Sequence, residues 1–273
     1  MATSTKREGG GLFDIESPMA IELRRIMIRL GRQLDLERKR AIMITSAERG
    51  EGKSLFSLHF ALVLAYHLQK EILLLDADVR RPVQHTVFQV PLSPGFAELL
   101  QGELDIKQAT HKTKVGNLHF MPAGLGGGNP SRLFAGGRVR DTVRKLHERF
   151  DIVVFDSPPV VPVSDPLHYL DAVDGTLYLV MAGQTHREVS LRGVEILRSA
   201  GANVLGAVAN NLAEGAAPLL RQRSTTGTTR GVEPGADSTA ADVKAPPDGG
   251  GLVRDGIVGQ DLVLKSLPTQ PWR

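Results

Sequence analysis

The residues best suited to chemistry in this chain lie in the stretch AERGEGKS, residues 47–54. Gly52, Lys53 and Ser54 have the types and spacing of a Walker A motif, in the form that allows Ala at its first position. In such a loop small residues let backbone N–H groups surround a phosphate, the lysine reaches the β- and γ-phosphates, and the serine hydroxyl ligates Mg²⁺. An apolar run precedes the motif and a helical pattern follows it, so the sequence predicts a phosphate-binding turn between a strand and a helix.

Acidic residues end two other apolar runs. The run ILLL leads into Asp76 and Asp78, and the run IVVF leads into Asp156. Ligands of parallel sheets bind at the carboxyl ends of the strands, and an aspartate there is typical of a Walker B motif that helps to hold Mg²⁺. Asp76 and Asp78 alternate along the chain, so we expect both on one side, with one pKa raised unless a cation lies beside them. All three carboxylates are expected to converge on one metal ion with Ser54.

The elements that must position these residues follow from the spacing of apolar side chains. Strands are expected at residues 41–44, 71–76, 117–121, 151–156, 175–181 and 203–209. Helices are expected from Ser17-Pro18 onward, after Lys53, after Pro94-Gly95, and at residues 138–150 and 187–200. Six strands alternating with helices predict an α/β fold of the P-loop NTPase kind, a doubly wound, mostly parallel sheet covered by helices on both faces.

Composition divides the chain into three parts. Residues 1–15 are expected to be a disordered leader, residues 16–213 one domain, and residues 214–273 a disordered low-complexity tail rich in Gly, Pro, Ala, Ser and Thr. Within the tail, the apolar patch at residues 262–267 is expected to fray or to dock on a partner. The domain opens with a basic helix over residues 16–40, interpreted either as a solvated cationic face or as a docking surface for an acidic partner, a neighbouring protomer or an anionic membrane.

Several classes of function are excluded or disfavoured. No apolar run approaches the ~18 residues of a transmembrane helix, and the first residues lack the apolar region of a secretory signal. Zero cysteines exclude disulfides and thiolate catalysis and fit a reducing cytosol. A formal charge of +3 with 5% aromatic residues argues against nucleic acid as a partner. The glycine run GLGGGN near residue 124 lacks the spacing of a dinucleotide loop and is interpreted as a surface loop.

These motifs together resemble those of the bacterial tyrosine kinases (BY-kinases) of the CpsD/CapB type, which govern capsule and exopolysaccharide production. The resemblance covers roughly residues 17–212. Besides Walker A, it rests on three aliphatic residues followed by DxDxR at residues 73–80 and on Walker B in VVFDSPP. The segments SPGFAELLQGE, NPSRLF and VLGAVANN are also similar to family segments.

The resemblance implies transfer of the γ-phosphoryl group of ATP to tyrosine, with Mg²⁺ as the metal. It assigns Asp76 as the base that takes the tyrosine proton, and Lys53 as the ligand of the phosphates. Ser54, Asp78 and Asp156 would hold Mg²⁺ and its waters, and Asn210 stands where related ATPases contact adenine. The full set of nucleotide contacts implied is Gly50, Glu51, Gly52, Lys53, Ser54, Leu55 and Asn210.

The family also implies partners. A member without its own membrane span is usually activated by a membrane-embedded regulator of polysaccharide chain length, which would hold this chain at the cytoplasmic side of the membrane. Its substrate would be a protein tyrosine in trans, and a homo-oligomer is a further expectation.

Three departures from the family pattern stand out. The three tyrosines are Tyr66, Tyr169 and Tyr178, so the tail has no tyrosine to accept a phosphoryl group. The oligomerisation motif Glu-x-x-Arg-x-x-Arg is imperfect, because Ile28 takes its last place. Leu55 stands where a hydroxyl residue often follows the P-loop serine.

Two other functions stay open. A MinD/ParA-like ATPase is one, although Glu48 stands where that group has a signature lysine. The other is a regulatory module of the polysaccharide machinery that binds nucleotide with little phosphotransfer.

Overall fold

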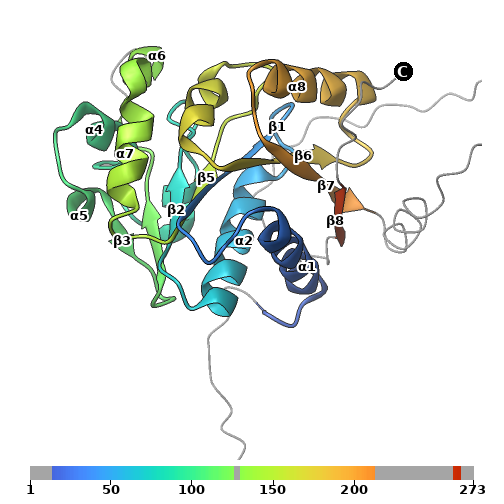
Figure 1. Ribbon diagram of the computed structural model, residues 1–273, viewed down its shortest axis with the longest axis horizontal. Helices are drawn as coiled ribbons and strands as arrows, with labels where there is room; N and C mark the ends of the chain where they lie inside the picture. The colour runs from blue at the N-terminus through green and yellow to red at the C-terminus, as the bar shows by residue number, and fades with distance from the viewer. Residues whose placement is uncertain (1–13, 126–129, 213–260, 266–273) are drawn as a thin grey trace, which may run out of the picture.

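The computed structural model describes residues 14–125, 130–212 and 261–265. These residues form a single eight-stranded sheet in the order β3-β4-β2-β5-β1-β6-β7-β8, with helices packed on it (Figure 1). The expected leader, the glycines of the run at residues 126–129 and most of the expected tail lie outside the described residues. The strands are β1 (Arg40–Ser46), β2 (Ile72–Asp76), β3 (His111–Lys112), β4 (Leu118–Met121), β5 (Ile152–Asp156), β6 (Gly175–Met181), β7 (Val204–Leu212) and β8 (Asp261–Lys265).

Helices connect these strands. They are α1 (Pro18–Gln33), α2 (Lys53–Leu68), α3 (Gln84–Phe88), α4 (Phe96–Gln101), α5 (Ile106–Ala109), α6 (Pro130–Leu133), α7 (Arg138–Leu146) and α8 (Arg187–Ser199), with 3-10 turns η1 (Ala135–Gly137) and η2 (Asp165–Ala172). Strands β4, β2, β5, β1, β6 and β7 run parallel, and β3 and β8 are antiparallel edges. The predicted α/β fold with a mostly parallel, doubly covered sheet is confirmed.

Alternating side chains of the central strands supply two separate cores. In β2, Ile72 and Leu74 pack with residues of α1 and α2, whereas Leu73 and Leu75 pack with residues of α4, α7 and α8. Successive side chains of a strand point to opposite faces, so a continuous apolar run is what a sheet covered on both sides requires. The same alternation sends Asp76, two residues beyond Leu74, toward the α2 face.

Helix α1 begins where the sequence predicts. The Ser17 hydroxyl accepts a hydrogen bond from the Ala20 N–H at 3.2 Å, and Pro18 occupies the first turn. The helix ends at Gln33, however, so the expected helix over residues 16–40 is too long. Leu34 is extended (φ −115°, ψ 124°) and buried together with Leu36, because the chain turns there to bring β1 into the sheet.

The C-terminal tail differs from the expectation at one place. Asp261–Lys265 forms β8, which pairs antiparallel with β7, with Val208 opposite Leu264. As the last parallel strand, β7 has an edge of unpaired backbone groups, and the apolar run in β8 pairs with that edge. Residues 261–265 of the expected tail are therefore paired in β8, and residues 266 and 267 of the apolar patch lie outside the described residues.

No helix within the described residues combines the length and the apolar character needed to cross a membrane.

Candidate active site

The P-loop joins β1 to α2 through two glycines with left-handed backbones. Gly50 has φ 80° and Gly52 has φ 83°, conformations that side chains other than glycine's rarely adopt. Gly52 is also needed for space, since a Cβ there would lie 2.3 Å from Asn210 Nδ2. The Gly52 carbonyl accepts the hydrogen bond from Phe56 N at 2.9 Å that begins α2, so the backbone turns directly from the loop into the helix.

Lys53 is buried at the start of α2. Its Nζ donates to Ser46 Oγ at 3.0 Å and to the Glu48 carbonyl at 3.1 Å, which ties the lysine across its own loop. Burial lowers the pKa of Lys53, and the negative charges nearby, Asp156 first, oppose that shift. Lys53 therefore lies close enough to Asp156, at the end of β5, for the two charges to attract each other.

Glu51 and Asn210 hold the loop in place. The buried Glu51 carboxylate accepts hydrogen bonds from the Glu48 N–H and from the Thr185 hydroxyl, so its side chain is bonded to the protein itself. From β7, Asn210 Nδ2 donates to the Glu51 carbonyl at 3.0 Å. The resemblance implies both residues as nucleotide contacts, and both form hydrogen bonds with backbone groups of the loop. Leu55, in the first turn of α2, is 38% exposed.

Asp76 and Asp156 form the acidic centre of the site. They are direct partners in the parallel register of β2 and β5, and both side chains are buried. Burial is the largest cause that raises the pKa of both carboxyl groups, to about 6 for Asp156. For Asp76 the charge of Asp156 raises the pKa further, so each acid of this pair disfavours ionisation of the other.

Hydrogen bonds donated to Asp76 and Asp156 lower the pKa values of these two acids. The Val83 and Gln84 N–H groups both donate to Asp76 Oδ2 at 3.2 Å. Bonds from Ser54 and Gln84 lower the pKa of Asp156 against the effect of burial, and Ser57 Oγ donates to Asp156 at 3.3 Å. The acidic pair thus faces the first turn of α2, which carries Lys53 and Ser54.

Asp78 lies in the turn that follows β2, and its place among the metal ligands stays a prediction. Strand β2 ends at Asp76, and Asp78 Oδ1 accepts from the N–H groups of Arg80 and Arg81 at 3.2 and 3.0 Å, which closes a turn. Once the strand ends, the rule that alternate residues share a face no longer applies. The principal acidic neighbour of Asp76 is Asp156, whose charge raises the pKa of Asp76 more than the charge of Asp78 does.

Gln84 is a buried residue of the site that the sequence analysis missed. Its Nε2 donates to Asp156 Oδ2 at 2.9 Å and to the Ser54 carbonyl at 2.8 Å, and it therefore bridges the P-loop helix and β5. Its position eight residues after Asp76, at the start of α3, gives no local signal.

Arg80 and Asp165 form a second missed feature at the same edge of the sheet. Arg80 donates to the buried Asp165 through Nε at 2.6 Å and Nη2 at 2.9 Å. Such a two-point fork fixes the orientation of both side chains. Nearby, the Tyr169 hydroxyl donates to the Ala77 carbonyl at 2.7 Å, so the turn after β2 is held from η2 at two points.

The donor set of this edge suits Mg²⁺, which prefers oxygen ligands and usually binds through one or two carboxylates, substrate phosphates and water. The raised pKa values of Asp76 and Asp156 fit a place where a cation would relieve repulsion. Within the described residues, no three acidic or histidine side chains are grouped closely enough to hold a metal ion by themselves. Ser54 with Asp156 is the best-placed pair of oxygen groups, and phosphates and water would supply the remaining ligands of a metal ion there.

Comparison with known proteins gives consistent results. No protein-family model matches the chain. It is 30% identical over 171 residues to the tyrosine-protein kinase YwqD of Bacillus subtilis, covering 63% of this chain and 72% of YwqD. In structure it is similar to the chimerical protein CapA2B2 (TM-score 0.67, 26% identity, 71% of this chain and 85% of that one).

The kinase domain of Escherichia coli tyrosine kinase ETK gives a TM-score of 0.66 at 26% identity, over 77% of this chain and 79% of that one. The septum site-determining protein MinD of Pyrococcus horikoshii, complexed with Mg-ADP, is similar in fold alone, at 17% identity and a TM-score of 0.52 over 62% of this chain and 69% of MinD.

Proposed function

The chain belongs to the bacterial tyrosine kinases, the BY-kinase family, and from that premise we propose that it transfers the γ-phosphoryl group of Mg-ATP to a protein tyrosine. The observation that supports the proposal most directly is the buried pair of Asp76 and Asp156 facing the first turn of α2. A phosphate-binding loop beside acids with raised pKa values combines the two requirements of phosphoryl transfer, a held phosphate chain and a nearby base.

Each residue of the site has a proposed role. Lys53 and the backbone N–H groups of residues 50–55 bind the phosphates, and Asn210 holds the loop next to the adenine. Ser54, Asp78 and Asp156 hold Mg²⁺ and its waters, with Asp156 closest to α2. Mg²⁺ supplies neutralisation of the phosphate charge. Asp76 accepts the proton of the tyrosine hydroxyl, a role for which a carboxylate with a raised pKa is suited.

The acceptor tyrosine is proposed to come from another molecule. Tyr169 and Tyr178 are buried, and their hydroxyls donate to backbone carbonyls. Tyr66 is 64% exposed near the end of α2, remote from the P-loop. Any self-phosphorylation between copies of this chain is therefore expected at Tyr66, and a Tyr66→Phe variant should lose it while still phosphorylating a substrate in trans.

We also propose the setting in which this activity works. Residues 16–213 act as the kinase domain and residues 214–273 as its tail, at the cytoplasmic side of the membrane through a membrane-embedded regulator of polysaccharide chain length. There the chain would regulate synthesis and export of an exopolysaccharide or capsule. Assembly into a homo-oligomer is part of the proposal, and Arg25 of the imperfect motif is already paired with Glu22 inside α1.

The test is phosphotyrosine detected by mass spectrometry after incubation with Mg-ATP and a copolymer of glutamate and tyrosine. Wild type should form phosphotyrosine and Lys53→Met should form none. Asp76→Asn should lower kcat by about 10²–10⁴-fold while nucleotide affinity stays within a few-fold. Phosphotyrosine formed equally by Lys53→Met would overturn the assignment.

The metal ligands are tested by nucleotide binding. Ser54→Ala and Asp156→Asn should each weaken Mg²⁺-dependent binding of a fluorescent ATP analogue, measured with and without chelator. Arg140→Ala, an exposed change on α7, serves as the control that should bind as wild type does. Unchanged ATP affinity in both site variants would contradict the proposed metal site.

A second candidate function is a regulatory module that binds nucleotide without phosphotransfer. The observation that favours it is the lack of any tyrosine after Leu212. If nucleotide binding orders the chain for binding a membrane partner but no phosphotyrosine forms, this regulatory module is supported. Nucleotide-dependent dimerisation with ATP hydrolysis and no phosphotyrosine would instead support a MinD/ParA-like ATPase, which is disfavoured because Glu48 stands where that group has its signature lysine.

A further inference from the structure

A cavity of about 550 Å³ lies between α2, α3 and the β3–β4 edge of the sheet, away from the P-loop. Its walls are mainly apolar, with Leu58 and Leu62 from α2 and Val87 and Phe88 from α3. Phe88 stacks on Phe120 of β4 with ring centroids 4.3 Å apart, so one wall is aromatic. This volume is in the range of sites that enclose a small molecule, and an apolar lining is typical of them.

The charged and ionisable groups of this cavity are basic. His111, Lys112 and Lys114 line it on the β3 side, and its described lining contains no aspartate or glutamate. Neither lysine takes part in an ion pair with another described residue. The buried Nε2 of His111 has no hydrogen-bond partner among the described residues, although buried polar groups normally have one.

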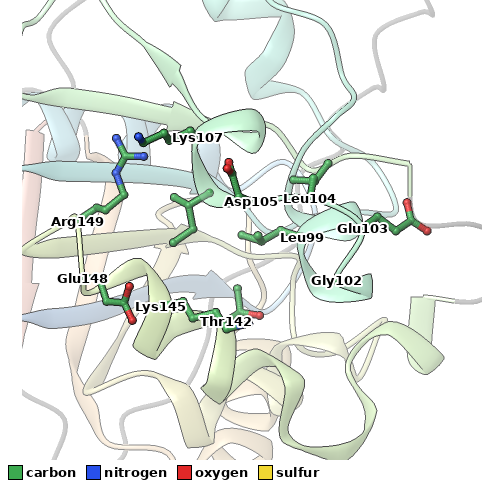
Figure 2. Close-up of a pocket in the computed structure, with 11 residues that line it drawn as sticks. Leu99, Gly102, Glu103, Leu104, Asp105, Lys107, Thr142, Lys145, Glu148 and Arg149 are labelled. Carbon is green, nitrogen blue, oxygen red and sulfur yellow. The ribbon is translucent and has the colours of Figure 1, made fainter.

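A second cavity, of about 460 Å³ between α5 and α7, shows what a balanced lining looks like. Figure 2 shows its basic residues Lys107, Lys145 and Arg149 interspersed with the acidic residues Glu103, Asp105 and Glu148. There the charges of the lining largely offset one another, which leaves little net attraction for an ion of either sign. The cavity at β3 therefore differs in carrying an uncompensated positive side next to apolar walls.

We propose that the cavity at β3 binds a small amphipathic organic anion, a molecule with an apolar body and a carboxylate, sulfonate or phosphate group. Its body would fill the space beside Phe88 and Phe120, and its charged group would lie at Lys112 and Lys114. An oxygen of the same group would give the Nε2 of His111 a partner. A volume of about 550 Å³ fits such a molecule, whereas a helix of a partner protein needs a longer groove.

Helix α3 connects this cavity to the candidate active site. It has five residues, and its first, Gln84, donates to Asp156 and to the Ser54 carbonyl, while Val87 and Phe88 near its end line the cavity. An occupant that shifts so short a helix also shifts Gln84. We therefore expect anion and Mg-nucleotide to change each other's affinity by the same factor, about fivefold.

The first test compares two fluorescent probes with the same rings. Anilinonaphthalene sulfonate carries the anion, and phenylnaphthylamine lacks it. The full-length protein should bind the sulfonate at one saturable site and at least about tenfold more tightly than the neutral probe. Equal affinity for the two probes, or binding that does not saturate, would overturn the proposal.

Charge reversal locates the site. The double variant Lys112→Glu with Lys114→Glu should weaken sulfonate binding about tenfold and leave phenylnaphthylamine within about twofold. Lys107→Glu with Lys145→Glu makes the same change of charge at the second cavity and should bind both probes as wild type does. If the control weakens the sulfonate as much as the first double variant, net charge rather than this cavity is responsible.

Thiol protection places the probe independently of charge. The chain has no cysteine, so Val87→Cys, at a position 48% exposed, introduces a single thiol at the cavity. The sulfonate should slow its reaction with a maleimide at least fivefold, whereas Leu125→Cys, at a position 61% exposed, should react at an unchanged rate. A Val87→Cys thiol that is unreactive without any ligand would show that the chain itself fills the cavity and would overturn the proposal.

The coupling is tested by repeating the sulfonate titration with Mg²⁺ and a non-hydrolysable ATP analogue. An identical Kd with and without the nucleotide would contradict the role of α3. Binding of the anion itself does not depend on the proposed kinase activity, so a protein that binds the sulfonate but forms no phosphotyrosine would refute only the proposed function.

Discussion

Two sets of buried carboxylates lie at the same edge of the sheet under opposite electrostatic conditions. Asp165 is fully buried, but the Arg80 fork neutralises it at 2.6 and 2.9 Å. Asp76 and Asp156 are buried beside each other, and the nearest lysine, Lys53, donates to its own loop instead. The first set has the partner that a structural ion pair needs, whereas the second stays under repulsion that a proton or a metal ion would relieve.

The largest expected effect comes from breaking the neutralised set. Arg80→Ala leaves Asp165 buried without a counter-charge, which should lower the free energy of unfolding by about 2–3 kcal/mol. The expected loss is smaller than for a fully buried ion pair because the arginine side chain is 34% exposed. Urea unfolding of the two proteins measures this difference. Arg140→Ala removes an exposed pair with Asp171 and should cost about 0.5 kcal/mol or less. Similar losses in both variants would mean that Asp165 does not depend on its partner.

The next effect is a pH dependence that belongs to the repelling set. The pKa of Asp156 is raised to about 6 in the folded state, above its unfolded value, so the folded protein binds more protons between those two values and loses stability as pH rises through that window. The Asp156→Asn variant has no carboxyl group at this position, so it lacks this loss of stability with rising pH. Relative to wild type, the variant should gain about 1–2 kcal/mol between pH 4 and pH 8 in urea unfolding.

Asp171→Asn, an exposed acid on η2, is the matched control for that pH dependence. Its stability relative to wild type should change little over the same range. If Asp156→Asn follows wild type at every pH, the repulsion between Asp76 and Asp156 is not felt in the folded protein.

A smaller effect is expected from the amide that partly compensates the repelling set. Gln84→Ala removes the hydrogen bonds to Asp156 and Ser54, which should cost about 1 kcal/mol and raise the pKa of Asp156 further. Unfolding experiments and carboxyl carbon NMR titration measure the two quantities. Gln33→Ala, at an exposed position of α1, should change neither. A lower pKa of Asp156 in the Gln84 variant would show that the amide does not stabilise its charged form.

The smallest effect concerns the acid that the sequence analysis grouped with this set. Asp78→Asn should lower the pKa of Asp156 slightly, because the Asp78 charge is a minor cause of its rise. The same NMR titration detects the shift, and Asp141→Asn on α7 should leave it unchanged. A shift as large as that caused by Asp76→Asn would place Asp78 in the pair after all.

Much of the fold could be predicted because its signals are local. Continuous apolar runs identify the six parallel strands, and Ser17 with Pro18 identifies the start of α1. The short strands β3 and β8 could not be predicted in the same way, since two or five residues carry little periodicity and pair only because a neighbouring edge is available.

The site was predictable only in part. The residues of the P-loop and the acids at the strand ends were identified from their types, but Gln84 and Asp165 were not. The fork between Arg80 and Asp165 joins positions 85 residues apart, and no local pattern reports that distance. The end of β2 at Asp76 was predicted, but the turn that follows it, in which Asp78 accepts hydrogen bonds from the N–H groups of Arg80 and Arg81, was not.

The amino-acid sequence by itself determined which residues can do chemistry here: a glycine loop ahead of Lys53 and Ser54, and carboxylates that end buried strands. The tertiary structure alone decided which of them meet. Strand order places β2 beside β5, and their register sets Asp76 against Asp156. The physical reason is that burial and the distance between charges, which set the pKa of both acids, exist only once strands far apart in the chain lie side by side.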